Sequence, residues 1–156
     1  MKEKIKGFTL IELIIVIAII AILAAIAFVA VNPAKRLGDA NNDQRWADVT
    51  AIADAWEKYT TDKLGVFPVP AIDATKIYEI GAGFDAVNCQ NDDGTAVDTA
   101  LDLQELVTEG YLGVIPSDDQ TLSTSGNGYY FEIDTNNIIK VGSCTSYDSA
   151  VIYVTR

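Results

Sequence analysis

Apolar and polar positions divide this chain into two unlike parts. The stretch from Leu13 to Val31 is a run of nineteen residues without a charged or polar side chain. A helix of this length, at about 1.5 Å per residue, spans the roughly 30 Å hydrocarbon core of a bilayer. The run is also longer than the apolar region of an ordinary cleaved signal peptide. The pattern therefore predicts a membrane-spanning helix.

After the apolar run, the pattern becomes that of an amphipathic helix from Asp39 to Lys63. The residues that recur there at spacings of three and four, and so share one face, are Trp46, Val49, Ile52, Ala53, Trp56, Tyr59 and Thr60. We expect the aromatic members to be core residues that cover a sheet. A path of aromatic side chains for charge transport is the alternative, and spacing alone does not support it.

A proline separates the two helical patterns. Pro33 lacks a backbone N–H and disfavours helix at the residue before it, so a kink or local unwinding is expected between about Ala27 and Pro33. The second helix should end at Gly65, which is followed by two prolines.

The remainder of the chain is mostly strand-like. The expected elements are strands at Lys76–Ile80, Tyr129–Asp134, Ile138–Gly142 and Val151–Val154, a hairpin turn at Asn136-Asn137, and a short helix within Leu101–Glu109. Together these elements predict an α+β fold, in which a long N-terminal helix packs on a small C-terminal antiparallel sheet.

The distribution of charge predicts how the chain is oriented across the membrane. Lys2, Lys4 and Lys6 precede the apolar run, so the N-terminus should stay in the cytoplasm and the remainder should lie outside. The net charge of −11 disfavours nucleic acid or anionic lipid as a bulk partner. The absence of histidine excludes triads with an imidazole base and zinc or iron sites with histidine ligands.

Glu12 is an unusual residue at the start of the apolar segment. A carboxylate inside a membrane helix costs about 2.5–3.5 kcal/mol on insertion scales, so it points to a function. No basic residue lies within the apolar run to pair with it. We therefore expect its partner to come from another chain, or from a new amino terminus made by cleavage upstream.

The segment KGFTLIELI, from Lys6 to Ile14, together with the apolar residues up to Ala27, resembles the class III leader and N-terminal helix of type IV pilins and type II secretion pseudopilins. The resemblance implies that a membrane peptidase cuts after Gly7 and then methylates the new amine of Phe8. It also implies that Glu12 is the assembly glutamate, which neutralises the amine of a neighbouring subunit. A plain single-pass anchor is the alternative, and it leaves this motif unexplained.

On this resemblance, residues 1–7 are the leader, 8–31 the transmembrane and filament-core helix, 32–64 the amphipathic stalk helix, and 65–156 the globular α+β head with a variable region at 89–144. The implied partners are copies of the chain itself, the prepilin peptidase and methyltransferase, the assembly platform and, indirectly, its motor ATPase. The precursor would lie in the cytoplasmic membrane and the assembled subunit in an extracellular filament. No cofactor and no direct nucleic-acid partner are expected.

The two cysteines, Cys89 and Cys144, are expected to form a disulfide if this part of the chain is exported. Such a bridge would contribute roughly 4 kcal/mol in the chain-entropy account. Two buried free thiols are the alternative.

No metal site is predicted. Aligning Gly94 with the invariant glycine of a calcium loop puts Cys89 and Ala100 at the positions of two acidic ligands, so that match fails. Asp118-Asp119 lies where major pseudopilins bind calcium, but the segment from Gln120 to Asn127 departs from their Asp-Pro-Trp-Gly pattern. Calcium at Asp118 is kept as an alternative.

Three classes of function remain to be compared. The leading hypothesis is a structural subunit of a type IV pilus, with a type II secretion pseudopilin or a minor pilin as the alternative within the family. A membrane-anchored enzyme would need a pair of acids or a nucleophile with a base, and no such arrangement is visible. A receptor for DNA uptake or adhesion would need a basic and aromatic patch, which the sequence lacks.

Overall fold

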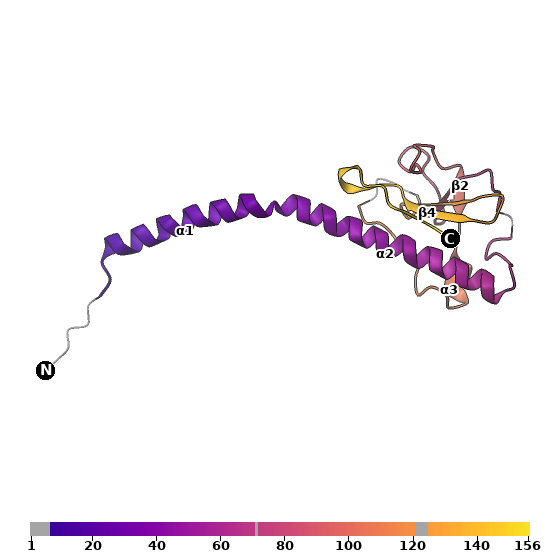
Figure 1. Ribbon diagram of the computed structural model, residues 1–156, viewed down its shortest axis with the longest axis horizontal. Helices are drawn as coiled ribbons and strands as arrows, with labels where there is room; N and C mark the ends of the chain where they lie inside the picture. Colours follow the sequence, from indigo (N-terminus) through magenta and orange to yellow (C-terminus); the bar gives the residue numbers. More distant parts are fainter. Residues whose placement is uncertain (1–6, 71, 121–124) are drawn as a thin grey trace. The chain divides into compact units, whose positions relative to one another are not determined.

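The computed structural model describes residues 7–70, 72–120 and 125–156. These residues form a helical unit that ends at Gly38 and a C-terminal unit from Asp39 to Arg156. The first helix, α1, spans Leu10–Val31 and contains no buried residue (Figure 1). Its 22 residues extend for about 33 Å at 1.5 Å per residue. The helical segment that begins at Leu10 is long and apolar enough, by length and composition, to cross a membrane.

A single residue interrupts the helix between its two parts. Asn32 adopts the left-handed conformation (φ 43°, ψ 77°) and ends α1, and α2 spans Pro33–Asp62. The side-chain oxygen of Asn32 accepts a hydrogen bond from the Lys35 N–H at 3.3 Å, as a helix N-cap does. Pro33 suits the first position of a helix because the N–H that it lacks would have no partner there. The second helix therefore begins at Pro33, earlier than the expected Asp39.

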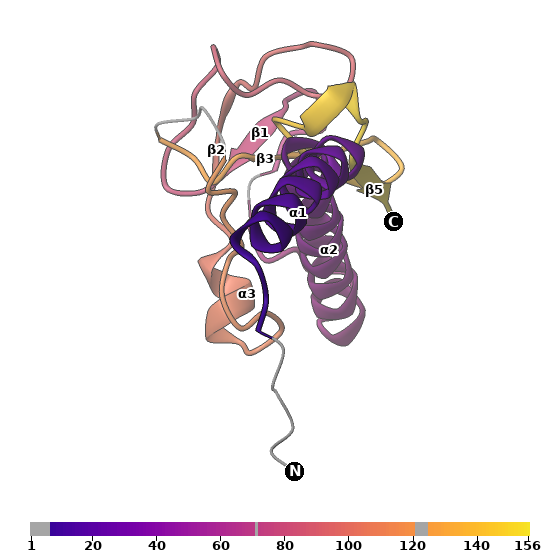
Figure 2. The same ribbon diagram turned by 90° about the vertical axis from the view of Figure 1, so that its left-hand side faces the viewer.

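The C-terminal unit contains a five-stranded mixed sheet, with the strand order β2-β1-β3-β4-β5. The strands are β1 Tyr78–Ile80, β2 Thr99–Leu101, β3 Tyr129–Ile133, β4 Ile139–Ser143 and β5 Tyr153–Thr155, and a short helix α3 covers Gln104–Thr108. Figure 2 shows β2 and β5 on opposite sides of the unit, with β1 and β3 between them. The predicted α+β fold is confirmed. The edge strand β2 was not predicted, and it runs parallel to β1, whereas the other pairs are antiparallel.

The main core lies between α2 and one face of the sheet. Val49, Ile52, Ala53, Trp56 and Tyr59 are buried on α2, at spacings of three and four. The Trp56 ring lies 4.6 Å from the Phe131 ring on β3 and 5.6 Å from the Phe67 ring, measured between centroids.

One aromatic residue of the predicted helical face is not part of this core. Trp46 is 42% exposed, so the prediction that it is a core residue was wrong. Its neighbour Arg45 is only 4% exposed, because its guanidinium group is enclosed by an acidic partner. The hydrophobic contact between α2 and the sheet begins at Val49, and polar contacts occupy the preceding turn.

A second, smaller core lies on the other side of the sheet. Alternate residues of a strand point to opposite faces. Tyr129 and Phe131 accordingly belong to the main core, and Tyr130 packs instead with Cys89 and Val97. The segment around Cys89 therefore covers the face of the sheet that α2 does not.

Candidate functional site

The N-terminal segment places the predicted cleavage point outside any helix. Gly7 and Phe8 precede α1, and the Phe8 side chain is 90% exposed. Among the described residues, and leaving out its chain neighbours, no atom lies within 4 Å of the position that a side chain at Gly7 would take. Residues 1–6, which make up most of the expected leader, lie outside the described residues. The described part of the chain therefore leaves Gly7 and Phe8 uncovered.

Thr9 and Glu12 form a capping box at the start of α1. The backbone N–H and the hydroxyl of Thr9 each donate to Glu12 Oε2 at 2.8 Å, and the Glu12 N–H donates to Thr9 Oγ1 at 3.3 Å. A cation was expected beside Glu12, and this neutral partner was not predicted. The spacing Thr-x-x-Glu ahead of an apolar run is the signal that would have found it.

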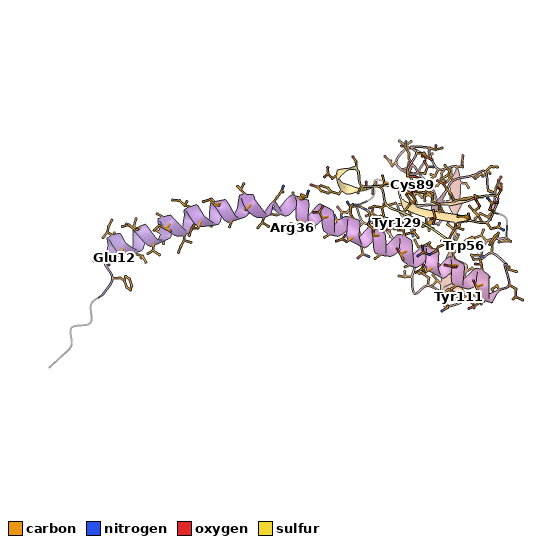
Figure 3. All side chains as sticks on the ribbon, in the orientation of Figure 1. Glu12, Arg36, Trp56, Cys89, Tyr111 and Tyr129 are labelled. Carbon is orange, nitrogen blue, oxygen red and sulfur yellow. A yellow bond between two sulfur atoms is a disulfide. The ribbon has the colours of Figure 1, made fainter. Side chains whose placement is uncertain are left out.

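The surface of α1 is apolar on every side. Each large aliphatic or aromatic side chain of the helix is at least 47% exposed, and Figure 3 shows these side chains around the whole helix from the labelled Glu12 onward. A single stripe would suit a helix lying on a core, whereas apolar residues all round suit burial on all sides. Alanines at 18, 21, 24 and 25 leave room for the close approach of other helices. Such a surface fits an environment of lipid or of other helices.

In the C-terminal unit, a buried ion pair joins α2 to a loop. Arg45 Nε donates to Asp118 Oδ2 at 2.8 Å and its Nη2 donates to Oδ1 at 3.3 Å. Asp118 also accepts hydrogen bonds from the Thr145 hydroxyl and the Gln120 N–H, both at 2.9 Å. Burial favours the neutral form of Asp118, but the hydrogen bonds from Arg45, Gln120 and Thr145 outweigh it and hold the pKa of this carboxyl below its usual value.

This ion pair bears on the calcium alternative. Both oxygens of Asp118 already accept hydrogen bonds, and the charge of Arg45 stands beside them. A calcium ion at Asp118 would have to displace that guanidinium group. Residues 121–124 of the same loop lie outside the described residues.

Cys89 and Cys144 are joined in a disulfide, with their Cα atoms 4.6 Å apart. Glu79 on β1 is fully buried, and one of its carboxylate oxygens and both sulfur atoms lie within 4.8 Å of one another. Two thiolates and a carboxylate would make a metal-binding set. The sulfurs bond to each other instead, so the set is a disulfide beside a buried carboxylate.

Within the described part of the chain, the hollow beside the end of α2 does not have the pair of carboxyl groups that a hydrolytic enzyme would need. The described residues that line it include Trp56, Phe67 and Arg156, and its acidic residue Glu57 lies 3.6 Å from the Arg156 guanidinium. A glycosidase-type mechanism needs two carboxyl groups that face one another. This hollow presents one, already paired with an arginine.

The comparisons with known proteins concern the N-terminal segment. Residues 3–28 match the family model described as the prokaryotic N-terminal methylation motif. The comparisons with curated proteins and with solved structures gave no match. The matched range includes Gly7, Phe8 and Glu12 and most of α1. It contains no residue of the C-terminal unit.

Proposed function

This chain carries the prepilin signature of the type IV pilin and pseudopilin superfamily, and on that premise we propose that it is the structural subunit of a type IV pilus. The observation that carries the proposal is the motif itself, continuous with a helix that has no buried residue. A soluble protein would hide such a surface in its own core. A filament subunit covers it first with lipid and then with the same helix of its neighbours.

Processing is the first proposed step. The prepilin peptidase would cut on the cytoplasmic side after Gly7 and methylate the amine of Phe8. The exposure of Phe8 and the open surroundings of Gly7 support access to this bond. Residues 1–7 would thus be removed, and residues 8–31 would remain as the membrane anchor.

Assembly is the second proposed step. The amine of Phe8 on one subunit would pair with the Glu12 carboxylate of its neighbour as both leave water. Because an unpaired buried charge is strongly unfavourable, this pairing would select the correct axial position of each subunit. Thr9 supports the step because its two hydrogen bonds already hold the Glu12 carboxylate in one place.

The remaining residues would form the parts of the subunit outside the membrane. Residues 32–64 would form the stalk, and residues 65–156 the head exposed on the extracellular filament, with the variable region between Cys89 and Cys144. The break at Asn32-Pro33 offers a point at which the helix can adjust during assembly. The subunit's partners would be its own copies, the peptidase, and the assembly platform with its motor ATPase.

Mass spectrometry of filaments sheared from the cell surface tests this proposal. The subunit should begin at a methylated Phe8 and carry one disulfide. Glu12→Gln should be processed normally and yet be missing from filaments, because the substitution removes the charge and keeps an acceptor for Thr9. Glu105→Gln, the same change at an exposed position of α3, is the matched control and should assemble.

A type II secretion pseudopilin or a minor pilin is the second candidate, because both carry the same motif. A subunit that is abundant in sheared filaments supports the major pilin. A processed chain that stays in the membrane fraction and is scarce in filaments supports the second candidate. Normal assembly of the Glu12→Gln variant would refute the pairing mechanism for either one.

A further inference from the structure

Glu79 is a buried carboxylate that the proposed function does not use. It lies in the middle of β1, is 0% exposed, and pairs in register with Ala100 on β2 and Tyr130 on β3. Its carboxylate lies beside the disulfide on the sheet face that α2 does not cover. Burying a carboxylate is costly unless the group is well bonded, so its contacts indicate what it does.

Each oxygen of the Glu79 carboxylate is connected to one cysteine by two hydrogen bonds in series. Oε2 accepts from the Asp85 N–H at 2.5 Å, and the Asp85 carbonyl accepts from the Cys89 N–H at 2.8 Å. Oε1 accepts from the Gly128 N–H at 3.4 Å, and the Gly128 carbonyl accepts from the Cys144 N–H at 3.0 Å. Glu79 thus binds the N–H groups of two residues, Asp85 and Gly128, and the carbonyl of each accepts a hydrogen bond from one cysteine N–H.

The packing around this carboxylate fits the same role. A side chain at Gly126 would collide with the Glu79 carboxylate. The backbone just before Gly128 therefore packs directly against this carboxylate. Val97 and Tyr130 pack around Cys89 and keep water away. Low-dielectric surroundings strengthen hydrogen bonds to a carboxylate. Neither of the two bonds to Glu79 uses a cysteine sulfur as donor or acceptor.

We propose that Glu79 is a positioning residue for the Cys89–Cys144 disulfide, and that it holds the two thiols at bonding distance in the folded, reduced chain. The oxidant would be a disulfide-bearing protein or small molecule outside the cytoplasm. One cysteine thiolate attacks the oxidant's disulfide and releases one thiol. The second cysteine thiolate then attacks the mixed disulfide and releases the other, so that two protein thiols become a disulfide and the oxidant becomes two thiols.

The test is the equilibrium of the full-length chain, in detergent, with mixtures of reduced and oxidised glutathione at fixed pH. The ratio of oxidised to reduced protein gives the effective concentration of the two thiols. In Glu79→Gln, an amide NH₂ group replaces one of the two acceptors, and the effective concentration should fall at least tenfold. This fall corresponds to a rise of about 30 mV in the reduction potential.

The matched control is Glu132→Gln. Glu132 lies on the neighbouring strand β3 and accepts a hydrogen bond from the Asn91 side chain at 2.8 Å. Glu132 is a half-buried carboxylate that bonds neither Asp85 nor Gly128, so the reduction potential of the Glu132→Gln variant should match that of the wild type. An unchanged potential in Glu79→Gln, or an equal rise in both variants, would overturn the proposal.

A second measurement applies if Glu79→Gln does not fold. In the reduced wild-type chain, the amides of Asp85 and Gly128 should stay protected from hydrogen exchange, because their bonds to Glu79 do not depend on the disulfide. Protection that is lost at both amides on reduction would show that the disulfide holds Glu79, and would overturn the proposal equally well.

Discussion

Breaking the buried ion pair between Arg45 and Asp118 should strongly lower the free energy of unfolding of the C-terminal unit. Arg45→Met removes the guanidinium group and keeps much of the apolar stem, so the change concerns charge more than packing. The two residues are 4% and 8% exposed, which leaves little room for water to replace the lost contact. Asp118 would then remain as a buried carboxylate without its cation.

The expected cost follows from this burial. Removing one partner of a buried ion pair typically costs about 3–5 kcal/mol. Asp118 keeps the hydrogen bonds from Thr145 and Gln120, so we expect a loss near the lower limit, about 3 kcal/mol. In the double variant Arg45→Met/Asp118→Leu no charge is left unpaired, and its stability should return to within about 1 kcal/mol of the wild type.

Urea unfolding of the full-length chain in a non-ionic detergent, followed by tryptophan fluorescence, measures these differences. Both tryptophans lie on α2, so the signal reports on the contact between α2 and the sheet. Lys63→Met is the control, because it removes an ion pair with Glu109 whose side chains are 39% and 38% exposed. It should cost much less than Arg45→Met, because water screens an exposed ion pair. If Arg45→Met costs no more than Lys63→Met, the reasoning from burial is refuted.

Three further predictions concern the same unit. Trp56→Ala should cost about 3–5 kcal/mol in the urea assay, whereas Trp46→Ala should cost about 1 kcal/mol or less, because Trp56 is 2% exposed and Trp46 is 42% exposed. Gly142→Ala should cost about 1–3 kcal/mol because its new methyl group would collide with a tyrosine ring on β3, and Gly113→Ala, with open space around it, should change stability by about 0.5 kcal/mol or less. The folded-state pKa of Asp118 lies below its unfolded value of about 3.9, so its contribution is present above that pH and should be lost as the pH falls through the lower folded value.

Each of these has an opposing outcome. Equal costs for the two tryptophan variants would mean that the face of α2 is not divided as described. A neutral Gly142→Ala would mean that the tyrosine ring moves aside without cost. An Asp118→Asn variant whose stability falls with acid as steeply as the wild type would assign that pH dependence to other carboxyl groups.

Local sequence was enough to predict the elements whose signals lie within a few neighbouring residues. The apolar run, the pattern of threes and fours after it, and the turn before Ile138 each depend on chain periodicity or turn chemistry. They predicted α1, most of α2 and the β3–β4 hairpin. The three-residue strand β2 was missed, and it forms where β1 offers an edge for parallel pairing.

The sequence by itself determined the N-terminal segment, because the methylation motif and the apolar helix are contiguous and their signals lie in neighbouring residues. Only the tertiary structure decided the polar interior of the C-terminal unit. Asp118 lies 73 positions from Arg45, and Gly128 lies 49 positions from Glu79. Nothing in the local pattern marks these partners, because a buried charge is stable only where a distant segment supplies its hydrogen bonds. The same reason explains why Arg45 is buried and Trp46 is exposed, the reverse of what their polarity predicts. Asp118 on the loop binds the Arg45 guanidinium group in the interior, and the adjacent Trp46 side chain lies at the surface.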